Sequence, residues 1–79
     1  MRGRPLPDGW KRPYLDALGE RLRELREAAG LSAPELAARV GTTRSHIHKL
    51  EAGKHAPRPE MAARLAAALG VDVQALRPR

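Results

Sequence analysis

Hydrogen-bonding and cationic side chains gather on one face of a helix expected over residues 43–52. At about 100° per residue, the core side of this helix holds Thr43, Ile47 and Leu50. The opposite arc holds these residues: Arg44, Ser45, His48, Lys49 and Ala52. That arc carries no acid, whereas an ordinary solvated helix face mixes both charge signs. Side chains of these types bond to base edges and phosphates, so the face predicts contact with nucleic acid.

The sequence gives little support for a catalytic or a metal-binding site. His46 and His48 lie two residues apart and point about 200° from each other on a helix, so they cannot chelate one ion. His55 falls in a loop, and the chain has no cysteine. Glu51 lies beside the core arc and is better placed to anchor the loop or a helix end than to act as a base. We see no nucleophile–base pair, carboxylate cluster or glycine-rich phosphate loop, and expect no enzymatic activity, metal, cofactor or small-molecule substrate.

Two short helices joined by a glycine turn must position this face. Ser32 and Glu35 form a capping box for a helix over 33–40, with Pro34 tolerated in its first turn. Gly41 supplies a left-handed turn, and Thr42 or Thr43 caps the next helix, which runs to about residue 52. This is the pattern of a helix-turn-helix, in which the second helix reads the DNA.

Three further helices complete an all-helical pattern. Apolar residues recur every three or four positions from Leu15, and Gly30 ends this first helix with Leu31 folding back. Its other face mixes acids with arginines, including Arg21, Arg23 and Arg26, and is expected to be solvated. A helix over 59–69 and a short fifth helix over 71–76, capped by Asp72, follow. We therefore predict an all-α fold of five short helices, with no strand.

Composition limits the class of protein. The 79 residues suffice for one small domain, and the net charge of +6 with a pI near 11.1 favours a polyanionic partner. The positive excess is concentrated in residues 1–14 and 41–59, which each carry a net +3. With no cysteine, signal segment or apolar run of about 20 residues, we expect a soluble cytoplasmic protein that associates with the nucleoid through DNA and not with membranes.

Two segments of the chain are separated by a proline-containing loop: GLSAPELAARVGTTRSHIHKLEAGK and LAAALGV. Together they resemble the five-helix DNA-binding domain of lambda-type phage repressors and Cro-like regulators, the XRE family. The resemblance covers about residues 17–76. It implies base contacts by the same four residues that the helical wheel selects: Arg44, Ser45, His48 and Lys49. Arg44 is the best candidate for base readout, with a phosphate contact as its alternative. Lys49 suits either role, and His48 suits a spacer or water-mediated contact.

The resemblance also implies phosphate contacts in the loop after the third helix, by Lys54, His55 and Arg58. The family usually has a phosphate-binding glutamine where this chain has Ala33. That contact is either missing or replaced by the Ser32 hydroxyl, a backbone amide or Arg39. Thr43 and His46 complete the predicted phosphate-contacting set.

These features predict a sequence-specific DNA-binding transcriptional regulator, expected to be a repressor, that binds a two-fold operator as a homodimer. The candidate dimer contacts are Val71, Val73 and Leu76. The alternative is that these residues only close the core. Two alternatives stay open: an antitoxin that also binds a toxin partner, and a restriction-modification controller.

The N-terminal residues are predicted to form a flexible basic arm over 1–14, before a domain over 15–76 and a tail over 77–79. Arg2 and Arg4 flank Gly3 as in an AT-hook, in which arginines lie in a narrow minor groove. A charged tail or a partner-binding segment is the alternative. Trp10 and Tyr14 lie close enough to the first helix to pack on the domain or across a dimer.

Overall fold

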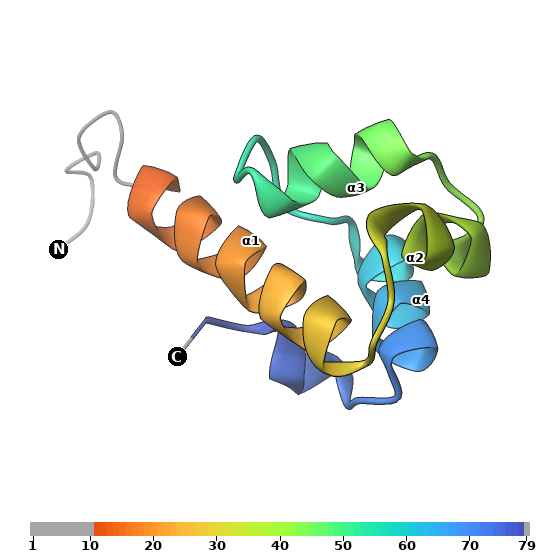
Figure 1. The fold of residues 1–79 in the computed structure, drawn as a ribbon. Helices are drawn as coiled ribbons and strands as arrows, with labels where there is room; N and C mark the ends of the chain where they lie inside the picture. The colour runs from red at the N-terminus through yellow and green to blue at the C-terminus, as the bar shows by residue number, and fades with distance from the viewer. Residues whose placement is uncertain (1–10, 79) are drawn as a thin grey trace, which may run out of the picture.

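A computed structural model describes residues 11–78, and in this range the chain is entirely helical apart from its connections (Figure 1). The elements are α1 (Lys11–Ala28), α2 (Ala33–Val40), α3 (Arg44–Glu51), α4 (Pro59–Leu69) and a 3-10 helix, η1 (Val73–Leu76). The described residues contain no strand, which agrees with the predicted all-α class. The expected fifth helix is instead a single 3-10 turn, whose start is capped by Asp72 Oδ1 accepting from the Gln74 amide at 2.8 Å.

The first helix begins earlier than the sequence pattern predicts. α1 starts at Lys11, so residues 11–14, which we expected in the arm, are helical. Pro13 permits this because its missing amide hydrogen has no partner in the first turn of a helix. Residues 1–10, with Arg2, Arg4 and Trp10, lie outside the described residues. The predicted end of α1 is confirmed: the Leu31 amide donates to the Arg26 carbonyl at 3.1 Å, as in a Schellman ending.

The core lies where α2, α3 and α4 meet. Leu36, Ile47 and Leu65, one from each of these helices, are fully buried. Leu22 of α1 and Leu76 of η1 close the same cluster from the other side. Thr43, which the helical wheel placed on the core side, is exposed because it serves as the N-cap and not as a packed residue.

Two arginines of α1 do not belong to the solvated face that the sequence predicts. The Arg21 side chain donates from Nε to the Ala75 carbonyl at 2.9 Å, which ties α1 to η1. Arg26 forms an ion pair with Glu51 of α3. Both arginines are half-buried, so α1 is held from two sides by its own charged residues.

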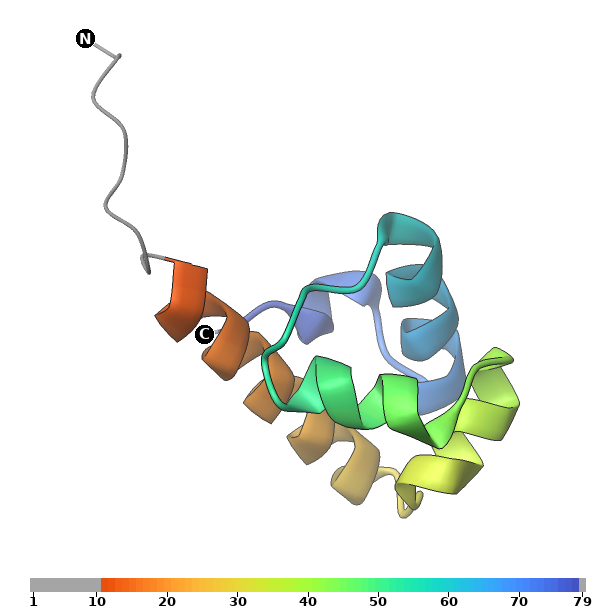
Figure 2. The same cartoon turned by 90° about the horizontal axis from the view of Figure 1, so that it is seen from above.

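α1 and α3 lie side by side in both views and approach closely at a glycine (Figures 1 and 2). A Cβ atom at Gly19 would overlap the Glu51 carbonyl oxygen and lie 2.8 Å from the Leu50 carbonyl oxygen. On the α3 side, a Cβ at Gly53 would lie 2.6 Å from Asp16 Oδ1. The end of α3 therefore rests directly on the backbone of α1.

Replacing Gly19 by alanine should destabilise the protein by about 1–3 kcal/mol, because backbone atoms must move to admit the methyl group. The sign is informative, since alanine in a helix interior is otherwise favoured over glycine by about 1 kcal/mol. Urea unfolding followed by circular dichroism measures the change. Glu20→Ala, at the neighbouring exposed position, is the control and should stay within about 0.5 kcal/mol. Unchanged stability of Gly19→Ala would contradict the close approach.

Candidate nucleic-acid interface

The start of α2 is fixed by a complete capping box. Ser32 Oγ accepts from the Glu35 amide at 3.1 Å, and Glu35 Oε1 accepts from the Ser32 amide at 2.7 Å. The hydrogen bond from the Ser32 amide favours the ionised carboxylate and lowers the pKa of Glu35. Gly41 then turns the chain with a φ of 78°, and the Thr42 amide donates to the Ala37 carbonyl at 2.9 Å. The direction in which α3 leaves this turn is therefore set by local hydrogen bonds.

The structure resolves which threonine begins α3. Thr43 Oγ1 accepts from the His46 amide at 3.1 Å, so Thr43 is the cap. Ile47 and Leu50 are buried, and this fixes the rotation of the helix about its axis. The four predicted base-contacting residues, Arg44, Ser45, His48 and Lys49, are consequently all exposed.

These four side chains form one surface. They line a shallow hollow of about 360 Å³ together with Ala52 and Lys54. None of the residues that line it is acidic. The surface thus combines the cationic side chains of Arg44 and Lys49 with the hydrogen-bonding groups of Ser45 and His48. They lie on the second helix of a helix-turn-helix, as in a recognition helix.

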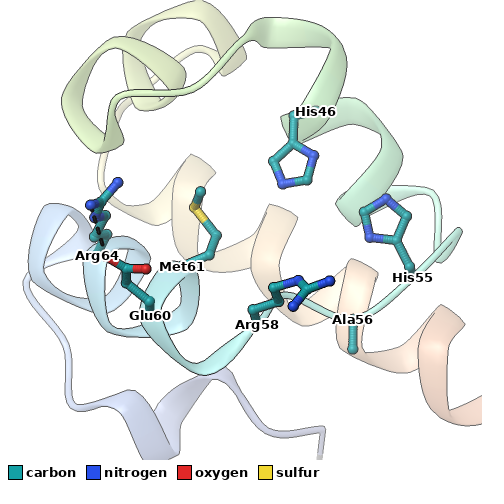
Figure 3. Close-up of a pocket in the computed structure, with 7 residues that line it drawn as sticks. All are labelled: His46, His55, Ala56, Arg58, Glu60, Met61 and Arg64. Carbon is teal, nitrogen blue, oxygen red and sulfur yellow. Dashed lines mark hydrogen bonds and ion pairs between the residues drawn. The ribbon is translucent and has the colours of Figure 1, made fainter.

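Three of the predicted phosphate-contacting residues gather at a second hollow beside the first turn of α3 (Figure 3). His46, His55 and Arg58 line this space of about 220 Å³ with Glu60, Met61 and Arg64. The imidazole rings of His46 and His55 lie 5.4 Å apart between centroids and are tilted by 30°. The sequence does not bring these two histidines together, because they belong to α3 and to the following connection.

The other candidate phosphate contacts are dispersed. Arg39, in the last turn of α2, and Lys54, after α3, are exposed. The Ser32 and Thr43 hydroxyl oxygens already accept amide hydrogens as helix caps, but each hydroxyl retains its proton as a donor.

The far end of α3 is held by a charged pair that sequence reasoning found only in part. Arg26 Nε and Nη2 donate to Glu51 Oε2 and Oε1 at 2.6 and 3.0 Å, and Arg26 Nη1 donates to the Leu31 carbonyl at 3.0 Å. The hydrogen bond with Glu51 raises the pKa of Arg26. The two side chains are 13% and 7% exposed, so neither would be easily solvated alone. Glu51 thus anchors a helix end, as expected. Its position beside the core arc was the sequence feature that indicated this role. Its partner on α1 had no such signal.

The three candidate dimer residues separate in the structure. Leu76 is 5% exposed and closes the core, and Val71 is half-buried against it. Val73 is 43% exposed and lies with Tyr14, which is 49% exposed, beside an apolar hollow of about 160 Å³. Of the three, Val73 is therefore the residue that is most available to a second molecule.

Among residues 11–78, no three His, Asp or Glu side chains are grouped as they would need to be to hold a metal ion. Within that part of the chain, no helix is both long and apolar enough to cross a bilayer.

Comparison with known proteins agrees with this geometry. The family model of the helix-turn-helix domain matches residues 17–79. The chain belongs to the helix-turn-helix family. A relative described as an uncharacterized HTH-type transcriptional regulator, from Methanothermobacter thermautotrophicus, is 49% identical over 49 residues, which are 62% of this chain and 71% of the relative.

Solved helix-turn-helix structures share the fold over most of its length. The restriction-modification controller protein C.AhdI from Aeromonas hydrophila superposes with a TM-score of 0.76 at 39% identity, covering 78% of this chain and 94% of the other. The clp gene regulator ClgR from Corynebacterium glutamicum superposes with a TM-score of 0.74 at 29% identity, covering 92% and 86%. The fold, the family and these relatives make the chain a DNA-binding transcriptional regulator.

Replacing Glu51 by alanine should destabilise this helix-turn-helix domain by about 3–5 kcal/mol, because it leaves the Arg26 guanidinium buried without its partner. Urea unfolding measures the loss. Glu24→Ala is the control, since Glu24 is 66% exposed and pairs with Arg21 at 3.5 Å, and such a pair contributes at most about 1 kcal/mol.

The double variant Arg26→Met, Glu51→Leu separates charge from packing. It should recover most of the lost stability, because apolar residues of similar volume often replace a buried ion pair without penalty. A double variant as unstable as Glu51→Ala would show that the hydrogen-bond geometry itself is required.

Proposed function

We propose that this helix-turn-helix protein binds an inverted-repeat operator as a homodimer, with α3 of each copy in the major groove. The single observation that carries the proposal is the exposed, acid-free face of α3. Its rotation is fixed by the burial of Ile47 and Leu50 behind it. The N-terminal residues of a recognition helix contact base edges, and in α3 these positions are Arg44 and Ser45.

The contacts divide into two groups by position. Arg44, Ser45, His48 and Lys49 are the proposed base contacts, and we propose that Arg44 bonds bidentately to guanine O6 and N7. Residues at the margins of this face are the proposed phosphate contacts: Ser32, Arg39, Thr43, His46, Lys54, His55 and Arg58. Such contacts fix the register of the protein on the duplex but carry no sequence information directly.

The dimer contact is proposed at the exposed pair Tyr14 and Val73. Both residues border the apolar hollow that Leu18, Pro57 and Ala62 help to line. One small domain offers few base contacts, and two copies on half-sites about 34 Å apart would double them. The residues Arg2 and Arg4 remain proposed minor-groove contacts next to these half-sites.

We propose repression as the regulatory outcome, since a dimer over a promoter excludes other proteins from it. A second candidate is control of a restriction-modification system. The similarity to C.AhdI at 39% identity over 94% of that protein favours it. The two roles use the same DNA-binding surface, and a neighbouring methyltransferase reading frame would distinguish them.

Arg44→Ala should relax base preference at one position of each half-site, with a loss of discrimination of about 1–3 kcal/mol. Selection of bound sites from random duplexes, followed by anisotropy titrations, measures it. Lys54→Ala is the matched comparison, because it removes a cation from the margin of the same hollow. It should weaken binding evenly across sequences and reduce the slope of log K against log salt by about 0.9.

The base preferences of the wild type and of these two variants test the proposal. A wild-type protein that selects no sequence, even at low salt, would contradict operator recognition. A change of base preference in Lys54→Ala, with none in Arg44→Ala, would show that the division between base and phosphate contacts is wrong.

Val73→Glu should disrupt the dimer, because it places a charge on the apolar surface beside Tyr14. We expect the variant to sediment as a monomer and to bind a full inverted repeat no better than a single half-site. Gln74→Glu is the control, since it adds the same charge at the next exposed position. A Val73→Glu protein that still binds the full repeat like the wild type would place the dimer contact elsewhere.

A further inference from the structure

We infer that His46, His55 and Arg58 form a phosphate site whose occupation takes up protons, so that DNA binding strengthens as the pH falls. This inference rests on the proposed function, since the ligand is a phosphodiester of the bound duplex. It adds regulation by pH to the proposed phosphate-contacting surface.

The geometry brings the three groups around one space. His46 projects from the first turn of α3, and His55 and Arg58 come from the connection that leads to α4 (Figure 3). In the figure, the two imidazoles and the guanidinium point toward the same region from different elements. The hollow of about 220 Å³ is several times the volume of about 30 Å³ that one water occupies in the liquid.

The charged residues around the hollow leave it positive. The connection contributes His55 and Arg58, and α4 contributes Glu60 and Arg64, which bond to each other at 3.0 Å. α1 and α2 contribute no residue to the lining. The formal charge of the lining is therefore +1 when both imidazoles are neutral and +3 when both are protonated.

This arrangement makes protonation depend on an anion. A histidine side chain changes charge between about pH 5 and 8. Protonation of both rings, whose centroids lie 5.4 Å apart in a hollow that Arg58 also lines, would place like charges next to one another in the free protein. A phosphate in the hollow that both rings line offsets the repulsion and accepts charge-assisted hydrogen bonds, because both nitrogens of a protonated imidazole are donors.

The direction of the effect follows from linkage. If the complex holds more protons than the separated protein and DNA, affinity must rise as the pH falls, and DNA binding must take up protons. An average uptake of half a proton gives about a tenfold gain in affinity over two pH units. His48, on the base-contacting face, is the remaining histidine and must be controlled for separately.

The test measures the affinity of the full chain for a 20-base-pair duplex at low salt by fluorescence anisotropy, in steps from pH 7.5 to 5.5. A duplex of arbitrary sequence is suitable because phosphate contacts require no particular operator sequence. The salt concentration is kept low because salt weakens these contacts. The wild type should bind about tenfold more tightly at the acid end. The double variant His46→Asn, His55→Asn should lose this gain, and the control His48→Asn should keep it.

Two further measurements keep the inference falsifiable. His55 is exposed, so His55→Asn should fold normally and lose part of the gain even if the double variant does not fold. His55→Lys carries a permanent charge and should bind more tightly than the wild type at pH 7.5, with a weaker dependence on pH. Calorimetry at pH 6.5 in two buffers of different ionisation enthalpy should show proton uptake by the wild type above that of the double variant.

The outcomes separate the two proposals. An equal pH dependence in the wild type and the double variant, or its loss in His48→Asn alone, overturns the inference while leaving DNA binding intact. An absence of duplex binding by the wild type at every pH overturns the proposed function itself.

Discussion

The contact between α1 and the end of α3 is the constraint on which the rest of the structure depends. Gly19 lets the last carbonyls of α3 rest on the backbone of α1, and the Arg26–Glu51 pair holds them there. The presence of both features has a physical reason. An ion pair this little exposed is favourable only in good geometry, and the close approach of the backbones supplies that geometry.

With one end fixed on α1, α3 is held at its other end by Thr43 and by the turn after α2. A helix of eight residues has little stability of its own, so α3 depends on these contacts at its ends and on the burial of Ile47 and Leu50. Positioning of this kind would let the proposed base-contacting side chains meet a base edge without first ordering the helix, which would reduce the entropic cost of binding.

The two hollows beside α3 suggest different uses of charge. The one along Arg44 and Lys49 carries permanent charge on the face that we propose enters the groove. The one at His46 and His55 is the site for which we propose a charge that depends on pH and on a bound phosphate. Sequence selection and proton-dependent affinity would then belong to separate groups of residues, on the exposed face of α3 and at its margin, so that either could change without the other.

Sequence alone was enough to predict the helical class, the bounds of α2 and α4 and the exposed face of α3, because capping residues, prolines and the 3.6-residue period act over a few neighbouring residues. It misplaced the start of α1, took Arg21 and Arg26 for solvated residues and gave Thr43 a core position. The tertiary structure decided the Arg26–Glu51 pair, the role of Gly19 and the pairing of His46 with His55. These contacts join residues that are far apart along the chain, and no local pattern carries information about which distant groups will meet when α1 packs against α3.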